Sequence, residues 1–258
     1  MIELYGKERE VVMPLCHGRE EEVTLYACVE GHMGKVWTNK KQDPDCAVVL
    51  AGDFFFILGY FLKEEENSIV DIMAAHKGYI IIVNEQEWKP FLKRLENEYK
   101  ESYKSFLRYA VDGNMEWFDK NKLYSLIERV PNEYSIQRID EEIFELTKEQ
   151  EWTKDFCSNF NSYEEFKTYG IGYVVMQENE ILAGASTYGY CKGKIEIQIE
   201  TKKDYRRRGL AIACASKLIL ECLERRIFPR WDAANLDSVA LAEKLGYRFS
   251  HEYRVFSI

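Results

Sequence analysis

The 258-residue sequence lacks features that would assign it to several large classes of protein. Its longest apolar stretch, residues 47–62, is broken by Gly52, Asp53 and Gly59 and is shorter than the roughly 20 apolar residues of a transmembrane helix. The first residues show no basic segment followed by an apolar run, so no signal peptide is predicted. The four histidines are scattered, so we expect no metal site.

The cysteines show no sign of a disulfide framework. The seven cysteines are odd in number and none shows C-x-x-C spacing. This pattern is typical of a reduced protein with buried thiols rather than of a disulfide framework. We therefore expect a cytoplasmic location and no membrane partner.

The sequence also lacks a basic character. Its net charge is -9 and its isoelectric point is near 5.2. An acidic chain argues against a general binder of nucleic acid or of anionic membranes. The charge is uneven, because residues 1–150 carry a net charge of -10 and residues 151–258 carry +1. We interpret the two halves as different structural objects.

Pro131 marks the expected domain boundary, near residues 128–133, which divides the chain into residues 1–130 and 131–258. In the first part, apolar runs predict strands at residues 23–29, 35–38, 47–51, 54–61 and 79–83. Helical spacing then predicts helices at residues 88–103 and 122–129. The linker is not rich in Gly or Ser, so packed rather than loosely tethered domains are expected.

The second part shows a more regular pattern. Strands are predicted at residues 134–139, 172–176, 181–188, 195–201, 228–232 and 248–258. Helices are predicted at residues 140–159, after Ser162, after Gly209 and at residues 236–245. This order predicts a fold of the α/β (α+β) class with a mixed, mainly antiparallel central sheet flanked by helices.

A strand, a short basic loop and a helix follow one another around Gly209. The strand alternates isoleucines with Glu196, Gln198 and Glu200, so the polar side chains share one face. The loop, residues 202–208, carries five Lys and Arg residues in an otherwise acidic protein. A helix N-terminus offers unpaired N–H groups and a partial positive charge, which together favour a pyrophosphate.

Two segments resemble the GNAT acetyltransferase superfamily. Arg206-Arg-Arg-Gly209-Leu-Ala211 is similar to its Arg/Gln-x-x-Gly-x-Gly/Ala loop, and Asn235-Leu-Asp-Ser238-Val-Ala-Leu-Ala-Glu-Lys-Leu-Gly246-Tyr247 is similar to its Asn-x-x-Ser/Ala-x-x-Leu-x-x-Lys-x-Gly-Phe/Tyr segment. The resemblance covers about residues 134–258 and looks like a bacterial branch with an extra N-terminal domain. One interpretation of residues 1–130 is a degenerate GNAT-like half that shapes the acceptor site.

The resemblance implies that acetyl-CoA is the cosubstrate, with its pyrophosphate on the backbone N–H groups of residues 207–211. The residues implied in cofactor binding are Ile199, Thr201, Arg206, Arg207, Arg208, Gly209, Leu210, Ala211, Asn235 and Ser238. It also implies direct transfer of the acetyl group to an amine in a ternary complex. The expected acceptor is a small molecule, because the chain shows no peptide- or nucleic-acid-recognition feature.

The amine must first lose its proton. For a lysine-like amine with a pKa of about 10.4, this costs roughly 4.6 kcal/mol at pH 7. By resemblance, Glu196 and Glu200 are the two candidate bases. Many relatives carry a Tyr as general acid where this sequence has Ala242, so Tyr247, Tyr205, a water or no acid at all are open alternatives.

Several of these residues have simpler interpretations. Asn235 caps a helix in one interpretation, and Trp231 belongs to the core in another. Cys214 and Cys222 are expected to pack on a helix face rather than to act as nucleophiles. For the whole chain, the alternatives are a catalytically silent CoA-binding sensor and a module whose basic loop grips an acidic protein. A homodimer is left open.

Overall fold

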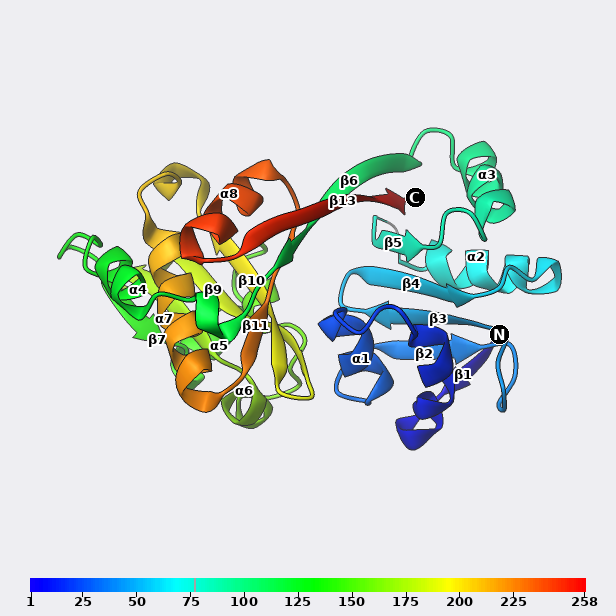
Figure 1. Ribbon diagram of the computed structural model, residues 1–258, viewed down its shortest axis with the longest axis horizontal. Helices are drawn as coiled ribbons and strands as arrows, with labels where there is room; N and C mark the ends of the chain where they lie inside the picture. The colour runs from blue at the N-terminus through cyan, green and yellow to red at the C-terminus, as the bar shows by residue number, and fades with distance from the viewer. Residues whose placement is uncertain (77) are drawn as a thin grey trace. The chain divides into compact units, whose positions relative to one another are not determined.

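The computed structural model describes residues 1–76 and 78–258, which form two compact units (Figure 1). Unit 1 consists of Met1–Arg108 and Glu252–Ile258, and unit 2 of Tyr109–His251. The chain passes between the units twice, inside β6 (Lys104–Asp112) and inside β13 (Arg248–Ser257). Each unit is described below by itself.

Unit 2 is built on a five-stranded sheet in the order β11-β10-β9-β8-β7. Its strands are β7 (Ser135–Arg138), β8 (Gly172–Gln177), β9 (Glu180–Cys191), β10 (Lys194–Thr201), β11 (Phe228–Arg230) and the separate β12 (Asp232–Ala233). Its helices are α4 (Lys120–Ile127), α5 (Glu141–Leu146), α6 (Tyr163–Tyr169), α7 (Leu210–Arg225) and α8 (Leu236–Leu245), with short 3-10 helices at Met115–Trp117, Lys154–Phe156 and Lys203–Tyr205.

Helix α7 covers one face of this sheet (Figure 1). Its apolar side, which includes Leu218 and Ile219, shares a buried core with Ile195 and Ile197 of β10. The aromatic and aliphatic side chains of α5, α6 and the segment between them form a second core, which includes Val174 of β8. The sheet therefore packs against a core on each face, and the isoleucines Ile195 and Ile197 of β10 lie on the face that α7 covers.

Unit 1 has the same strand order as unit 2. Its strands β1-β2-β3-β4-β5 are the first five of an eight-stranded sheet that continues β13-β6-β12. In it β1 to β4 pair antiparallel and β5 pairs parallel with β4. The elements are β1 (Ile2–Leu4), a 3-10 helix (Gly6–Cys16), α1 (Val23–Val29), β2 (Lys35–Thr38), β3 (Cys46–Ala51), β4 (Phe54–Gly59), a 3-10 helix (Lys63–Glu65), α2 (Glu66–Ala74), β5 (Ile80–Val83) and α3 (Lys89–Glu98).

The match extends to the helices. In each unit a three-strand meander is followed by one helix and then by a strand parallel to the last strand of the meander: β2-β3-β4-α2-β5 in unit 1 and β8-β9-β10-α7-β11 in unit 2. This repeated order supports the interpretation of the first part as a GNAT-like half.

The division of the chain differs from the expected boundary near residue 130. Residues 109–130 lie in unit 2. The reason is their packing, because Val111, Phe118 and Leu123 are buried in the same core as α7. Pro131 does interrupt the helical pattern, since α4 ends at Ile127 and β7 begins at Ser135, but a break in local structure is not a domain boundary.

Several local predictions were wrong. Residues 23–29, predicted as a strand, form helix α1; nearly every residue in it is buried, and such a short apolar run shows no period that separates helix from strand. The helix predicted at residues 140–159 is α only over Glu141–Leu146. There the Thr147 and Thr153 hydroxyls donate to backbone carbonyls of Phe144 and Thr147, at 2.8 and 2.7 Å, in competition with helical pairing.

Two further differences concern β-structure. The strand β6 (Lys104–Asp112) was not predicted, and the helix predicted at residues 88–103 is shorter, since α3 ends at Glu98. The strand predicted at residues 228–232 is divided: β11 pairs with β10, and β12 pairs with β6. This second difference matters for the site.

Candidate functional site

Strand β10 leaves part of one edge unpaired. It pairs with β9 along its whole length, but with β11 only at Lys194, Ile195 and Glu196. Beyond that point the chain after β11 turns to pair with β6 through Asp232 and Ala233. In the five-stranded sheet, residues 197–201 therefore have a strand neighbour on one side only.

The direction of the backbone groups along this edge follows from one hydrogen bond. Lys202 donates its N–H to the Leu182 carbonyl of β9, at 2.9 Å. Alternate residues of an antiparallel strand direct both backbone groups to the same neighbour. The N–H and C=O groups of Ile199 and Thr201 thus face the unpaired edge. The Thr201 N–H already donates to Glu200 Oε1 and the Thr201 carbonyl already accepts Arg206 Nε, so a ligand with amide groups would pair first with the groups of Ile199.

The loop that follows β10 ends in a helix N-terminus. Gly209 has φ +80° and ψ 6°, and it is the residue that precedes α7. Within the described part of the chain, the N–H groups of residues 207–211 have no acceptor, and a Cβ added to Gly209 would meet no atom within 4 Å. The buried side chain of Leu210 anchors the first turn to the core. Free N–H groups at the positive end of a 16-residue helix suit an anion.

Two arginines hold this loop in shape. Arg206 donates from Nε to the Thr201 carbonyl at 3.2 Å, and its Nη2 lies 3.0 Å from Oε1 of Glu200. Arg208 donates to the Asp204 carbonyl at 3.1 Å and to the Tyr134 hydroxyl at 3.2 Å.

Two cations lie near the ring of Tyr205. The Arg208 guanidinium is 4.8 Å from the ring centroid and Lys202 Nζ is 5.7 Å from it, while Lys202 also pairs with Glu180. Each contact is weak at this exposure, because water screens the charges. Together they fix the path of the loop. The sequence gives no local signal for the partners Tyr134 and Glu180, because both come from distant segments.

The two candidate bases both have partners. Glu196 Oε1 accepts the N–H of Asp232 at 2.9 Å, at the point where β10 and the chain after β11 separate. Glu200 Oε1 faces Arg206 and also accepts the N–H of Thr201 at 3.0 Å. Glu200 is thereby tied to the loop, whereas Glu196 bridges the two diverging strands. The structure brings both carboxylates onto β10, as predicted.

The side chains of the second motif are also engaged. Asn235 Oδ1 accepts the N–H of Ser238 at 2.9 Å, which is the N-cap of α8. The Ser238 hydroxyl accepts the indole N–H of Trp231 at 3.0 Å, and Trp231 is 2% exposed. The capping interpretation of Asn235 and the core interpretation of Trp231 are thus confirmed. Sequence reasoning missed the bond between Trp231 and Ser238.

Of the alternatives for a general acid, Tyr247 is poorly placed. Its side chain is 3% exposed and its hydroxyl donates to the Pro229 carbonyl at 2.7 Å. Burial raises the pKa of Tyr247 well above its usual value. The Ala242 position is itself fully buried. Neither Tyr247 nor Ala242 therefore provides an accessible proton.

The cysteines are buried thiols rather than nucleophiles. All seven are free and buried. Burial raises the pKa of the Cys28 and Cys157 thiols to about 12, and it raises the pKa values of Cys214 and Cys222 as well. Because the thiolate is the reactive form, these groups are inert at neutral pH.

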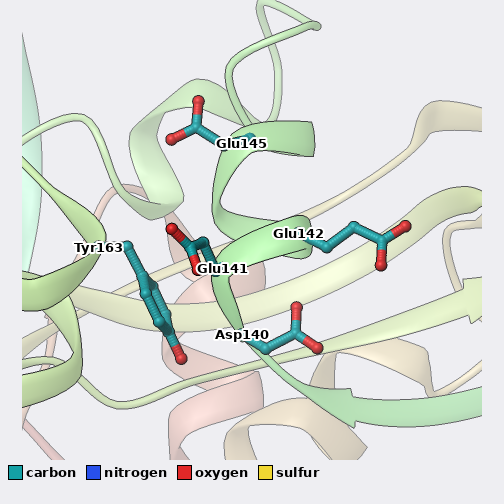
Figure 2. Close-up of a pocket in the computed structure, with 5 residues that line it drawn as sticks. All are labelled: Asp140, Glu141, Glu142, Glu145 and Tyr163. Atoms are coloured by element: carbon teal, nitrogen blue, oxygen red, sulfur yellow. The ribbon is translucent and has the colours of Figure 1, made fainter.

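A surface hollow in unit 2 gathers acidic side chains (Figure 2). It is lined by Asp140, Glu141, Glu142, Glu145 and Tyr163, none of them among the predicted site residues. Asp140 caps α5 by accepting the N–H of Ile143, and Figure 2 shows the carboxylates of Glu142 and Glu145 extending in different directions. Within residues 1–76 and 78–258, no group of three or more His, Cys, Asp or Glu has the arrangement of a metal site.

Comparison with known proteins places this geometry in a family. The family model described as GNAT acetyltransferase matches residues 13–256. The chain therefore belongs to the GNAT acetyltransferase family and is an acyltransferase. The match extends well beyond residues 131–258 and includes most of unit 1. No helix of the described residues is long and apolar enough to cross a membrane.

Individual relatives agree with this assignment. An uncharacterised N-acetyltransferase of Bacillus subtilis (strain 168), YdfB, is 26% identical over 78% of this chain and 71% of its own length. A GCN5-related N-acetyltransferase-like protein of Streptococcus suis 89/1591 has a solved structure that is 32% identical, with a TM-score of 0.86 over 97% of this chain and 98% of that one. A GCN5-related N-acetyltransferase of Kribbella flavida, 12% identical with a TM-score of 0.59, covers 92% of this chain and 93% of its own and shows the fold alone.

Proposed function

We propose that this acyltransferase moves an acetyl group from acetyl-CoA directly to the amine of a small molecule, in a ternary complex. One observation carries the proposal. The unpaired edge of β10 at Ile199 and Thr201 continues into a basic loop whose N–H groups, residues 207–211, lack acceptors. An amide-bearing chain that ends in a pyrophosphate fits this combination of groups.

The residues present fit the cosubstrate. The N–H groups of residues 207–211 would hold the pyrophosphate at the positive end of α7. Leu210 anchors the first helical turn, and the small side chain of Ala211 leaves room for the ligand. The backbone of Ile199 would hold the amide-bearing arm, and Thr201 would join it by exchanging its present hydrogen bonds with Glu200 and Arg206. Asn235 and Ser238 stay predicted contacts of the coenzyme. The Asn235 side chain would keep its bond to the Ser238 N–H, and the Ser238 hydroxyl would keep its bond from Trp231.

When bound, acetyl-CoA supplies the activated acetyl group as a thioester. The chain's own task is to orient the amine and take its proton. We assign the base to Glu196, because it lies where the strands diverge and Glu200 is tied to Arg206. A positioned base contributes about 10²–10⁴-fold. No side chain is assigned as general acid. Ala242 has no proton to give and the Tyr247 hydroxyl is buried, while Tyr205 and a water stay open alternatives.

The acceptor class rests on charge. The net charge of -9 speaks for a small amine rather than a nucleic acid or an anionic membrane. An acidic protein also attracts a cationic amine, which carries its positive charge until it is deprotonated.

Thermal unfolding with and without acetyl-CoA tests the cosubstrate site. At about 100 times Kd, binding adds roughly 2.7 kcal/mol and raises Tm by about 5–10 °C. Two matched variants serve as controls, Gly209→Asn and Gly209→Asp. Both side chains tolerate a positive φ and have the same size, but only Asp puts a negative charge beside the free N–H groups.

We expect Gly209→Asn to keep much of the shift and Gly209→Asp to lose it. An amine panel followed by detection of the released thiol then tests transfer. If the native protein shows no shift at millimolar acetyl-CoA, the assignment of the cosubstrate is wrong.

A second candidate is a CoA-binding sensor without catalysis. The observation that favours it is Ala242 together with the buried hydroxyl of Tyr247. This candidate predicts the same thermal shift but no thiol release with any amine, and no difference between the native protein and Glu196→Gln.

A further inference from the structure

The chain after α7 changes its strand neighbour at a single residue, Trp231. Up to Arg230 it runs parallel to β10, with Arg230 opposite Glu196, and from Asp232 on it pairs with β6. Trp231 is the one residue between β11 and β12. The contacts that hold Trp231 in place therefore decide where β10 loses its neighbour.

The side chain of Trp231 is fixed on two sides. It is 2% exposed, and its indole N–H donates to the Ser238 hydroxyl of α8 at 3.0 Å. Its ring centroid lies 5.7 Å from that of Tyr247, whose own hydroxyl donates to the Pro229 carbonyl at 2.7 Å. A buried indole whose N–H is satisfied and whose ring packs against another ring has little freedom to shift.

The turn at Trp231 redirects one backbone N–H. Phe228 donates its N–H to the Gly193 carbonyl at 2.8 Å, and a parallel ladder repeats in steps of two residues along both strands. If the ladder continued, the N–H of Asp232 would reach the carbonyl of Ile197. It donates instead to Oε1 of Glu196, at 2.9 Å. The turn thus transfers a donor from the sheet to the carboxylate that we assign as the base.

We propose that Trp231 is a positioning residue for the reaction: its anchored indole holds the turn at which the Asp232 N–H meets Glu196, and it thereby sets the orientation of the base. The proposal rests on the proposed function, in which Glu196 takes the proton of the amine. A base must lie about 2.6–3.2 Å from the atom that loses the proton, and a misplacement of about 1 Å costs about 100-fold in rate. A buried side chain behind the base can therefore control kcat.

A double-mutant cycle tests this link. Trp231→Phe keeps a buried aromatic ring but removes the N–H that donates to Ser238. We expect kcat to fall about 10-fold while the Kd for acetyl-CoA stays within about threefold. In a Glu196→Gln background the same substitution should change kcat less than about twofold, because the group that it positions no longer acts as the base. Losses that add in the cycle would overturn the proposal.

Tyr247→Phe is the matched control. It also removes one hydrogen bond from this buried cluster, but it keeps the ring that packs against Trp231. We expect its kcat to equal the native value. If Tyr247→Phe lost as much kcat as Trp231→Phe, any weakening of the core would have the same effect, and the proposal would be wrong.

Ser238→Ala breaks the same hydrogen bond from its other end and leaves the indole in place. If Trp231→Phe does not fold, the cycle is repeated with Ser238→Ala at saturating acetyl-CoA, so that weaker coenzyme binding does not enter kcat. We expect the same non-additive loss with Glu196→Gln, and additive losses would again contradict the proposal.

Hydrogen exchange at the Asp232 amide tests the geometry without a substrate. We expect this amide to exchange at least about fivefold faster in Trp231→Phe than in the native protein or in Tyr247→Phe, because its bond to Glu196 is weakened. Unchanged exchange in Trp231→Phe would refute the positioning role. Faster exchange in the variant of a protein that acetylates no amine would instead refute the proposed function, while the link between Trp231 and Glu196 would stand.

Discussion

At the scale of single residues, Glu196 and Glu200 have different tasks although they share one strand face. The Glu196 carboxylate accepts the Asp232 N–H, and an amide oxygen can do the same. We therefore expect Glu196→Gln to fold like the native protein and to lose about 10²–10⁴-fold in kcat with acetyl-CoA affinity unchanged. Steady-state kinetics with an accepted amine, together with titration of acetyl-CoA, checks this.

Glu200→Gln is the companion variant. It removes the charge that faces Arg206, so the loop and the affinity for acetyl-CoA should suffer more than kcat. If Glu196→Gln turned over like the native protein and Glu200→Gln lost most of its kcat, Glu200 would be the base and Glu196 the structural residue.

Tyr247 offers a second prediction at this scale. Tyr247→Phe removes the hydroxyl that donates to the Pro229 carbonyl and leaves that carbonyl without this donor. We expect a loss of about 1–2 kcal/mol in the free energy of unfolding, measured in urea, and an unchanged kcat. A variant of native stability that no longer turns over would mean that the phenol takes part in the reaction.

Some of these residue-level features could be predicted from the sequence and some could not. Asn235 as an N-cap and Gly209 before a helix are local, so the residue type and spacing were sufficient. The partner of Glu200 is six positions away, and that of Glu196 lies 36 positions away on another strand. Tertiary pairing of this kind leaves no trace in spacing, which is why the two carboxylates looked equivalent.

At the scale of elements, α7 is fixed to the sheet by an ionic network as well as by its apolar face. Glu221 of α7 forms an ion pair with Arg138 of β7, in which Nη2 lies 3.1 Å from Oε1. Its carboxylate also accepts a hydrogen bond from the Tyr173 hydroxyl of β8, at 2.7 Å. Burial alone would raise the pKa of Glu221, but the hydrogen bonds from Arg138 and Tyr173 outweigh it and lower the pKa below 4.5.

This network predicts a pH dependence of stability. A carboxyl whose pKa is lowered by folding contributes stability above its unfolded pKa, and this contribution is lost as pH falls through the folded value. We expect Glu221→Gln to cost about 2 kcal/mol near pH 7, a partly exposed pair being worth less than a fully buried one. In urea titrations the difference in free energy of unfolding between the native protein and Glu221→Gln should become smaller below about pH 4.5. A difference that stays constant with pH would show that packing, not charge, holds the helix.

Elements were predicted unevenly, and the reason is physical. The meander β8-β9-β10 and helix α7 have long, clear periods and were found within a few residues. Helix α1 is short and buried on nearly all sides, so its residues show no period. The division of residues 228–233 into β11 and β12 depends on which strands they pair with, and no local pattern encodes a partner.

At the scale of the whole molecule, the two units share a strand order but differ at the corresponding edge. In unit 1, β5 pairs with β4 at four consecutive residues, Phe54 to Ile57. The Gly59 carbonyl beyond them already accepts the Trp88 indole N–H at 2.9 Å. The edge that stays unpaired in β10 is thus filled in β4.

The loop after β4 differs as well. Where unit 2 has three arginines and a glycine, unit 1 has Lys63 followed by three glutamates, Glu64 to Glu66. Glu66 is 3% exposed and pairs with Arg94, with Nη1 to Oε2 at 3.1 Å, and with Lys63. Carboxylates at the start of α2 favour the helix dipole but repel a phosphate. The corresponding position in unit 1 is therefore closed by its own side chains and has the wrong charge.

This contrast predicts one acetyl-CoA per chain, although the fold is repeated. Isothermal titration of the full-length protein should give a stoichiometry of 1, and Gly209→Asp should abolish all binding, because a negative charge beside the N–H groups of residues 207–211 opposes the pyrophosphate. Gly209→Asn controls for the added side chain and should retain most of the affinity. A stoichiometry of 2, or a site that survives in Gly209→Asp, would mean that the Trp88 indole and Glu66 give way to ligand, and unit 1 would have to be assigned a cosubstrate site of its own.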